Sequence, residues 1–218
     1  IDCLIHMAAI LPGNKSYNLL NLKFVNYTNT KTLINWTAKR KIFFIFFSSL
    51  SIFNKKKSEY TKFKRKIEKY LLKKKLNYLI LRPSSIYGYS QKERSFLLDK
   101  INDIKKNKIL RVYRPINLKL NFIHAHDVCR ALIFLLKKNK KGVFNVKSER
   151  NISIKEIMRI LQKIFILKKN IIYLDKKIKN NDIKTDISHQ KLKKLGWRTK
   201  INLYEGIKKS FLENKFIL

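Results

Sequence analysis

Glycine, proline and cysteine are scarce in this chain of 218 residues, which has 5, 3 and 2 of them. Two cysteines cannot form a framework of several disulfides or a metal centre built of cysteines. The glycines stand at positions 13, 88, 142, 196 and 206, so no Gly-x-x-Gly-x-x-Gly loop occurs. That loop cradles the pyrophosphate of a dinucleotide at a helix N-terminus. The sequence therefore excludes a pyrophosphate site of this kind within the residues given.

Long apolar runs are missing as well. The longest, 42–53, is interrupted by three serines, and it is far shorter than the roughly 20 residues that cross a bilayer. No signal peptide is visible. We therefore predict that the protein has no membrane partner and works in a reducing cytoplasm.

Acidic residues are few, with 14 Asp and Glu against 51 Lys and Arg, and the net charge is +37. A charge of this size can indicate a surface that binds nucleic acid. Binding modules of that kind gather their basic residues on one stripe, whereas these lysines are spread along the whole chain. We interpret most of them as solvated and keep a basic nucleic-acid-binding protein as the least favoured alternative.

Apolar runs alternate with helical patterns in the first part of the chain. The runs at 2–10, 41–49 and 77–83 predict buried parallel strands. Helical spacing at 19–38 and 58–75 places a helix after each of the first two strands. This alternation predicts a Rossmann-like parallel sheet with helices on both faces.

After residue 86 the rhythm changes to shorter elements. The patterns predict helices at 94–106, 127–138 and 203–214, and strands near 110–113, 120–124 and 142–146. Asp127 is expected to cap its helix, and Ser153 with Glu156 forms a capping-box pattern before another. We predict a small mixed α/β lobe over the carboxyl edge of the sheet, where open α/β sheets bind ligands. The expected domains are 1–86, a partial NAD(P)-binding domain, and 87–218, mainly a substrate lobe, with about 120–146 returning to the sheet.

Tyr60 and Lys64 are spaced i, i+4, so both project from one face of the second helix. A phenol has a pKa of about 10, and a nearby ammonium favours the phenolate, which could act as a base. Ser48 and Ser49, at the end of the preceding strand, could hydrogen-bond a substrate oxygen. The set suits proton removal from an alcohol while a hydride leaves to a nicotinamide. The spacing alone fits a packed tyrosine beside a solvated lysine equally well.

Seven motifs follow one another along the chain: DCLIHMAA, NYTNTKTLINWTAK, FFSSLSIF, YTKFKRKIE, LNYLILRPSSIYG, NFIHAHDVCRALIFLL and the closing GVFNVKSERNISIKEI with DISHQKLKKLGW. Their order resembles the extended short-chain dehydrogenase/reductase family, the NAD-dependent epimerase/dehydratases typified by UDP-glucose 4-epimerase. In that family the glycine loop and first strands lie upstream of the first motif. The resemblance therefore implies an N-terminally truncated member.

The resemblance also implies roles for single residues. Tyr60 would be the catalytic base and acid, Lys64 would lower its pKa and hold the nicotinamide ribose, and Ser49 would be the catalytic hydroxyl. The cofactor would be NAD or NADP, and the substrate a nucleotide sugar oxidised transiently at one hydroxyl. No metal is expected. Further cofactor contacts would come from Met7, Ala8, Ala9, Asn26, Ser48, Pro83 and Ser85.

Two departures from the family pattern favour an alternative. Leu120 stands where the family often has an arginine that grips the substrate phosphates, and Lys119 or Arg111 is the predicted substitute, with Ser85 as a further substrate contact. Ser49 and Tyr60 are only eleven positions apart, which is shorter than in typical sugar epimerases. The alternative is a catalytically silent NAD(P)H-binding relative with a structural role. The family further implies a homodimer through the helices at about 19–38 and 58–75.

Overall fold

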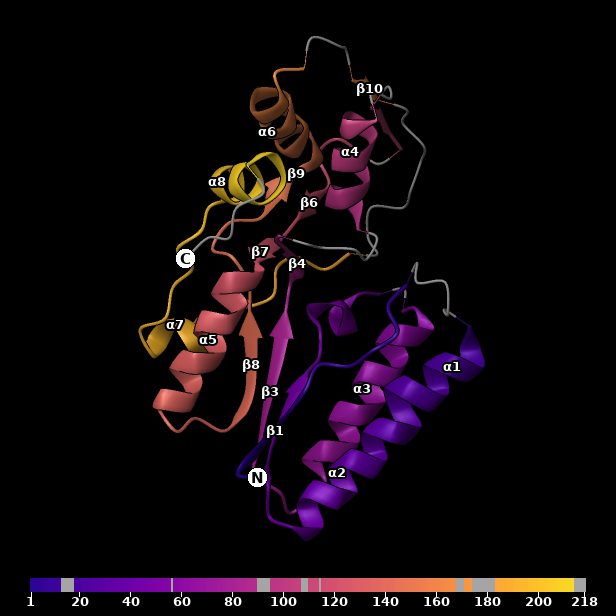
Figure 1. The fold of residues 1–218 in the computed structure, drawn as a ribbon, viewed down its shortest axis with the longest axis vertical. Coiled ribbons are helices and arrows are strands. Elements are labelled where there is room, and N and C mark those ends of the chain that lie inside the picture. The colour runs from indigo at the N-terminus through magenta and orange to yellow at the C-terminus, as the bar shows by residue number, and fades with distance from the viewer. Residues whose placement is uncertain are drawn as a thin grey trace.

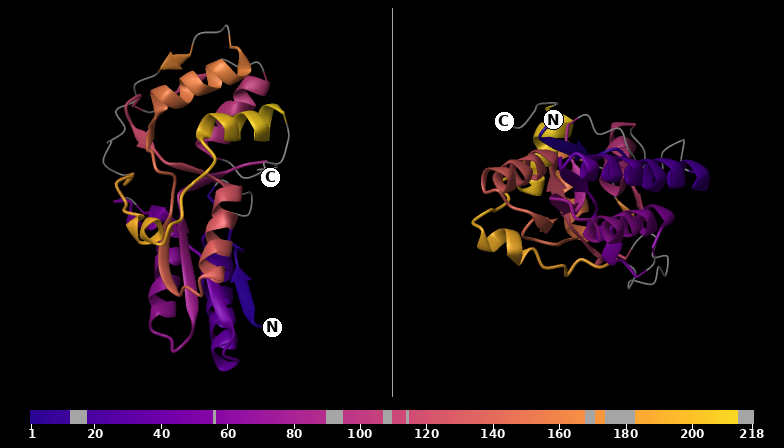
Figure 2. Two further views of the ribbon diagram at one scale, coloured as in Figure 1. Left: turned by 90° about the vertical axis from the view of Figure 1, so that its left-hand side faces the viewer. Right: turned by 90° about the horizontal axis from the view of Figure 1, so that it is seen from below.

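The computed structural model describes residues 1–12, 18–55, 57–89, 95–106, 110–113, 115–167, 171–173 and 183–213. Figure 1 shows two parts, a sheet flanked by helices and, above it, a lobe of short strands and helices. Figure 2 shows the same division from the side. The predicted Rossmann-like parallel sheet with an additional mixed lobe is confirmed.

Four parallel strands form the sheet in the order β1-β2-β3-β8. They are β1 Cys3–His6, β2 Phe43–Phe47, β3 Tyr78–Pro83 and β8 Gly142–Val146. In register, Ile45 of β2 lies between Ile5 of β1 and Leu79 of β3. Because the strands run the same way, their carboxyl ends meet at one edge, which faces the lobe (Figure 1).

Helices cover both faces of the sheet. One face carries α1 Leu19–Lys23, α2 Thr30–Lys39 and α3 Glu59–Leu72, and the other carries α5 Ala125–Lys137. Phe44 and Phe46 of β2 belong to the core beneath α2 and α3, whereas Ile45 and Phe47 belong to the core beneath α5. Successive side chains of a strand point to opposite faces, so two covered faces require the continuous apolar runs of the sequence.

The first helical segment is continuous but not uniform. A π-helical stretch, Phe24–Asn29, joins α1 to α2 and was not predicted. Such stretches carry one extra residue per turn, which no apolar spacing over a short window reveals.

The helix starts confirm one expected cap and correct another. The capping box of Ser153 and Glu156 is present at the start of α6, Ile154–Phe165. The prediction that Asp127 caps α5 is wrong, because the side chain of His124 accepts the cap hydrogen bond from His126 N. The buried carboxylate of Asp127 instead accepts hydrogen bonds from the backbone N–H groups of Lys200 and Ile201. Asp127 thus fastens the C-terminal segment to α5.

The lobe is held together by an apolar core beneath short strands. Its helices include α4 Phe96–Lys105 and α8 Leu203–Ile207, and α7 Gln190–Lys194 lies beside the sheet. The short strands pair as β4 Ser85–Tyr87 with β7 Phe122–His124, β6 Lys119–Leu120 with β9 Ile152–Ser153, and β5 Arg111–Val112 with β10 Ile172–Tyr173. Leu97, Ile101, Ile157 and Met158 are fully buried between the helices.

Nowhere in the described chain is a helix long and apolar enough to cross a membrane.

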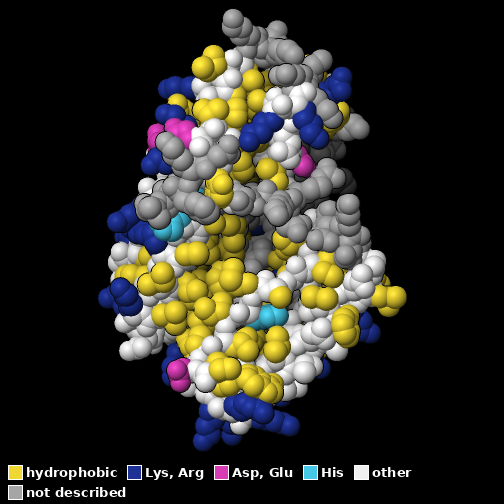
Figure 3. Space-filling view, in the orientation of Figure 1, with side chains coloured by type: hydrophobic (Ala, Val, Ile, Leu, Met, Phe, Trp, Pro, Cys, Tyr) yellow, Lys and Arg dark blue, Asp and Glu magenta, His cyan; other side chains and the backbone are white. Residues whose placement is uncertain are grey.

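Strand β1 differs from the prediction of a buried strand. Within the described sheet it lies at one end and pairs only with β2. Ile5 is therefore 47% exposed and Met7, just after the strand, 61%. Figure 3 shows apolar side chains gathered on the face of the molecule on which this strand lies. A strand edge with free backbone groups and apolar neighbours is a site where proteins associate.

Candidate active site

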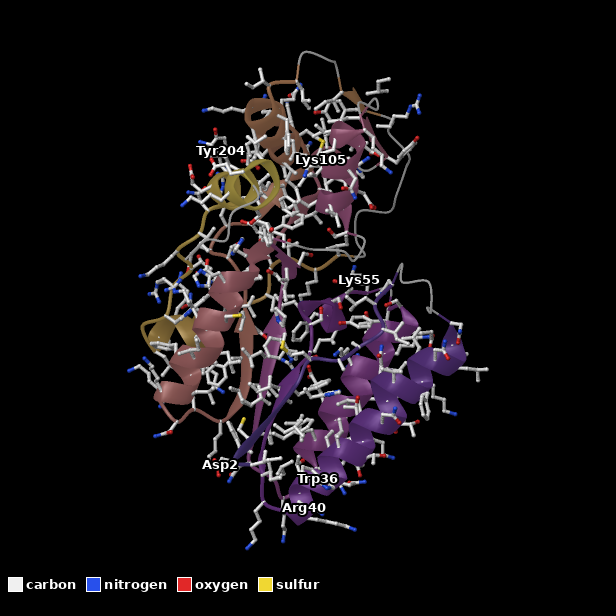
Figure 4. All side chains as sticks on the ribbon, viewed as in Figure 1. Asp2, Trp36, Arg40, Lys55, Lys105 and Tyr204 are labelled. Atoms are coloured by element: carbon white, nitrogen blue, oxygen red, sulfur yellow. The ribbon has the colours of Figure 1, made fainter. Side chains whose placement is uncertain are left out.

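Segments that follow three neighbouring strands meet at the carboxyl edge of the sheet. Residues 7–9 follow β1, Ser48 and Ser49 follow β2, and residues 84–85 follow β3. Lys55 lies near the level of this edge, beneath the lobe (Figure 4). Trp36 and Arg40, whose guanidinium stacks 4.5 Å from the Trp36 ring centre, lie at the opposite end. The predicted residues Met7, Ala8, Ala9, Ser48, Ser49 and Ser85 thus follow strands that end at one edge of one sheet.

Lys64 joins the tyrosine helix to the serine strand. Its side chain is 3% exposed, and its Nζ donates a hydrogen bond of 2.7 Å to the carbonyl of Phe47, the last residue of β2. The ammonium also lies 4.6 Å from the ring centre of Phe46. Burial lowers the pKa of Lys64 to about 8, against the opposing charge of Glu68. A lysine in this position is a fixed cation next to Ser48 and Ser49 rather than a solvated one.

Tyr60 has an electrostatic setting opposite to the predicted one. Burial raises the pKa of its phenol to about 12, whereas the sequence predicted that Lys64 would lower it. The ammonium of Lys64 lies 5.7 Å from the centre of the Tyr60 ring and is hydrogen-bonded to Phe47. Loss of hydration therefore outweighs the attraction of the nearby cation. Both side chains do project from one face of α3, as their spacing predicts.

The two serines after β2 make different contacts. The Ser49 hydroxyl accepts hydrogen bonds from the backbone N–H of Ser51, at 3.1 Å, and from its hydroxyl, at 2.9 Å. These contacts begin a 3₁₀ turn over Leu50–Phe53. The Ser48 Oγ is buried and finds no hydrogen-bond partner within the described residues. A buried hydroxyl without a partner is costly, so Ser48 Oγ is available to bond a ligand atom or a water molecule.

A chain of hydroxyls ties this turn to the start of α3. Ser51 Oγ lies 3.4 Å from Thr61 Oγ1, which lies 3.0 Å from Ser58 Oγ. Ser58 caps α3 by accepting from the backbone N–H of Thr61. The position of Tyr60 relative to the serines is therefore determined at both ends of the loop between them.

The segment after β1 is held by Asn26, which is 2% exposed. Its side-chain amide accepts from Ile10 N at 2.8 Å and donates to Ile10 O at 2.9 Å. Both functions of the amide are thus used on the backbone. Met7 and Ala8, in contrast, are exposed. Asn26 positions residues 7–10 and leaves their surface available.

Two groups near the site were not predicted from the sequence. His6 is buried between Thr30, whose hydroxyl lies 3.0 Å from its Nε2, and the rings of Phe44 and Phe46. Burial, and then the charge of Lys64, lowers the pKa of His6 to about 4. A histidine inside an otherwise apolar strand was the available signal.

The second unpredicted group is the ion pair of Glu68 with Arg82. The Arg82 Nε donates to Glu68 Oε1 at 3.0 Å, and the guanidinium also reaches Oε2. The Glu68 side chain is only 4% exposed. A glutamate on the apolar face of α3 and an arginine within an apolar strand are each unusual, but only the fold shows that they pair.

A pocket of about 130 Å³ opens between the sheet edge and the lobe. Ser49, Pro83 and Ser85, all predicted site residues, line it, and Leu120 lies on its lobe side. Lys119 and Arg111, the predicted phosphate ligands, do not, and both are exposed elsewhere on the lobe. Tyr60 does not line it either. The remaining lining residues are Leu50, Ser51, Asn54, Ser84, Asn121, Ile183, Lys184, Thr185 and Ile187.

His124, which stands two positions before His126, has a structural environment. Its Nε2 lies 3.0 Å from Ser210 Oγ, and its Nδ1 accepts from His126 N. Both ring nitrogens are therefore used. Among the residues that the structure describes, no three histidine, cysteine or acidic side chains come together as a metal site would need.

The sequence of the chain matches the profile of one known protein family. The profile of the NAD dependent epimerase/dehydratase family matches residues 1–146. This range includes β2, after which Ser49 follows, and α3, which carries Tyr60 and Lys64. The chain belongs to this family. The resemblance inferred from the seven motifs is confirmed.

Other members of the epimerase/dehydratase family are similar in sequence. The chain is 26% identical over 152 residues to bovine (Bos taurus) dTDP-D-glucose 4,6-dehydratase, a match that covers 66% of this chain and 42% of the bovine protein. It is 27% identical over 140 residues to a putative UDP-glucose 4-epimerase of Methanocaldococcus jannaschii, covering 62% and 44%. The chain thus spans less than half the length of these relatives.

Solved structures share the fold. UDP-glucose 4-epimerase from Thermotoga maritima superposes with a TM-score of 0.83 at 21% identity, over 97% of this chain and 76% of that one. UDP-glucuronic acid 4-epimerase from Bacillus cereus, solved with UDP-glucuronic acid and NAD, gives 0.84 at 22% identity, over 97% and 74%. These structures show that the chain shares the fold of the UDP-sugar epimerases.

Proposed function

We propose that this chain is part of an NAD(P)-dependent epimerase or dehydratase that acts on a nucleotide sugar by transient oxidation at a sugar hydroxyl. The observation that carries the proposal is the hydrogen bond from buried Lys64 to the carbonyl of Phe47. It fixes the tyrosine helix against the strand that delivers Ser48 and Ser49. Family membership and the names of the relatives, which act on dTDP- and UDP-sugars, support the substrate class.

In this proposal Tyr60 exchanges a proton with the sugar hydroxyl, and Ser49 donates a hydrogen bond to the same oxygen. With a pKa of about 12, the phenol is protonated near neutral pH. It must therefore release its own proton to solvent before the phenolate can accept the proton of the sugar hydroxyl, and a nearby cation favours that release by stabilising the phenolate. Lys64, as the nearest buried cation, is the residue of this chain that supplies such stabilisation.

The residues at the sheet edge fit one end of a dinucleotide. Among the described residues the buried Ser48 hydroxyl has no partner, the exposed Met7 and Ala8 border the same edge, and Lys64 offers an ammonium. Ala9, Pro83 and Ser85 complete the proposed contacts, while Asn26 acts through the backbone of Ile10. When bound, NAD(P) would accept a hydride from the sugar and return it. Because no glycine-rich loop occurs in these residues, they provide only the nicotinamide end of the site.

The arrangement of the chain supports the proposed division of labour. Residues 1–86 would bind the cofactor and the lobe within 87–218 the substrate. We also propose a homodimer through α2 and α3, although the outer surface of α3 carries Lys62, Lys66 and Lys69, which would repel the same residues of a second copy. Cys3 and Cys129 are free thiols, which is compatible with the predicted cytoplasmic location.

The test is a Tyr60→Phe variant, assayed for turnover of dTDP- and UDP-hexoses with added NAD or NADP. We expect a loss of about 10²- to 10⁴-fold, the range for removal of a general acid or base, with cofactor affinity retained. Tyr70→Phe is the matched control, because its hydroxyl lies on the same helix and is hydrogen-bonded to Asn35 and Lys74. Full activity of Tyr60→Phe would contradict the proposed role.

A second outcome favours the alternative function. If the parent protein binds NAD(P)H but turns over none of these sugars, it is a catalytically silent relative. Two observations support the catalytically silent alternative. The pKa of Tyr60 is raised, and the apolar Leu120 lines the pocket.

A further inference from the structure

The pocket between sheet and lobe has an uneven distribution of charge. Its described lining is made of hydroxyls, amides and apolar groups, and Lys184 is the one residue among them with a charge. Leu120 lies in the same lining. Within the described lining, an anionic group of a ligand can therefore pair with a cation only at Lys184, on the segment 183–187.

This segment is held firmly against the rest of the molecule. The backbone N–H of Lys184 donates to Asn54 Oδ1 at 3.1 Å, so it is tied to the turn that follows Ser49. The next carbonyl, of Thr185, accepts from Lys147 Nζ at 3.0 Å and from Asn151 Nδ2 at 3.3 Å. Ile187 is 8% exposed and anchors the other end. The backbone that carries Lys184 is thus positioned before any ligand arrives.

The side chain of Lys184 is free to bind. It is exposed, and within the described part of the chain it forms no ion pair. The neighbouring carboxylate, Asp186, interacts with Lys147 instead. Its charge raises the pKa of Lys147, but burial has the larger effect and lowers it overall. When an exposed lysine on a fixed backbone binds a ligand, the only conformational entropy that it loses is that of its own side-chain rotamers.

The other polar groups of the pocket suit the same ligand. The Ser84 Oγ is buried and has no partner among the described residues, and Ser49 and Ser85 present further hydroxyls. Hydroxyl groups with one ammonium match a phosphate ester attached to a polyol. Lys119 and Arg111 lie on strands outside this lining.

We infer that Lys184 is the residue that binds the diphosphate of the substrate, and that it takes the place left by the apolar Leu120. The inference rests on the proposed function and adds to it a residue that determines specificity for diphosphate-linked sugars. The ammonium would pair with the phosphate oxygens while the serine hydroxyls contact the sugar. Lys119 and Arg111 have no part in it.

The test measures binding rather than turnover. Dissociation constants for UDP-glucose, dTDP-glucose and the nucleosides uridine and thymidine are determined by thermophoresis at low protein concentration, at two salt concentrations. In Lys184→Ala we expect binding of the sugar nucleotides to weaken about 10- to 100-fold, the effect of losing one charge-assisted hydrogen bond. Nucleoside binding stays unchanged, the salt dependence decreases, and Lys184→Arg retains most of the affinity.

Lys119→Ala is the matched control, an exposed lysine of the same lobe outside the pocket, and its affinities should equal those of the parent. If the parent binds a sugar nucleotide and Lys184→Ala binds it equally well, the inference about Lys184 is wrong and the proposed function stands. If Lys119→Ala, and not Lys184→Ala, weakens binding, the phosphate site lies on β6. If the parent binds no sugar nucleotide, the proposed function fails, and this inference with it.

Discussion

The sheet half of the molecule and the lobe bury different kinds of side chain. Near the sheet edge, His6, Lys64 and Glu68 are 7%, 3% and 3% exposed. The core of the lobe is made of aliphatic and aromatic residues, with His124 buried beside Ser210, and a pair such as Arg150 with Glu156 lies at its surface. Buried ionisable groups are costly unless they are paired. The stability of the sheet half therefore depends more on paired ionisable groups, and that of the lobe more on apolar packing.

This difference separates the two sides of the candidate site. On the sheet side Lys64 is buried and Tyr60 is half-buried, and loss of hydration perturbs the pKa values of both. The lobe side presents Lys184 on the surface of a pocket. Changes on the first side should affect folding and chemistry together, and changes on the second should affect binding alone.

The largest effect is expected from breaking the buried ion pair of the sheet half. Arg82→Met leaves the Glu68 carboxylate buried without its cation. We expect the free energy of unfolding to fall by about 3–5 kcal/mol, the cost of removing one partner of a buried pair. Urea unfolding at neutral pH measures it.

The matched change in the lobe is Arg150→Met, because the Arg150 side chain is 77% exposed in its pair with Glu156. Exposed pairs of this kind contribute about 0–1 kcal/mol. Equal losses for Arg82→Met and Arg150→Met would remove the proposed contrast between the two halves.

The next effect concerns acid. The pKa of His6 is lowered from 6.5 to about 4, first by burial and then by the charge of Lys64. The unfolded chain binds this proton more tightly, so the stability is present above about pH 6.5 and is lost as the pH falls towards 4. The whole shift corresponds to about 3 kcal/mol. We expect unfolding experiments between pH 7 and 4.5 to show a steeper loss in the parent than in His6→Gln. Parallel curves would show that His6 is not held neutral.

The smallest effect tests the shape of the lobe. A Cβ on Gly206 of α8 would lie 2.1 Å from the hydroxyl oxygen of Tyr87, which is itself 2% exposed. Gly206→Ala should therefore lower stability by about 1–3 kcal/mol through overpacking, with little dependence on pH. In a Tyr87→Phe background the loss should be smaller, because the nearest clashing atom is gone. Thermal unfolding of the four proteins measures the coupling, and an unchanged loss would place the clash elsewhere.

Much of the fold follows from local patterns. The apolar runs around Phe44 and Leu79 predict buried parallel strands because a strand covered on both faces has no polar side. The run after Asp2 has the same character, yet β1 is half exposed, because no other strand of the described sheet pairs with its outer side. Asp127 was misassigned for a similar reason, since the backbone N–H groups that donate to its carboxylate lie more than 70 positions away.

The sequence by itself determined the order of the elements, the capping box at Ser153 and the shared face of Tyr60 and Lys64, because each depends on neighbours within a few residues. Only the tertiary structure decided that Lys64 turns to the Phe47 carbonyl, that burial raises rather than lowers the pKa of Tyr60, and that Glu68 finds Arg82. It also brought Lys184 to the pocket in place of Lys119. These features depend on distances between residues far apart in the chain and on the water excluded between them, which no local spacing encodes.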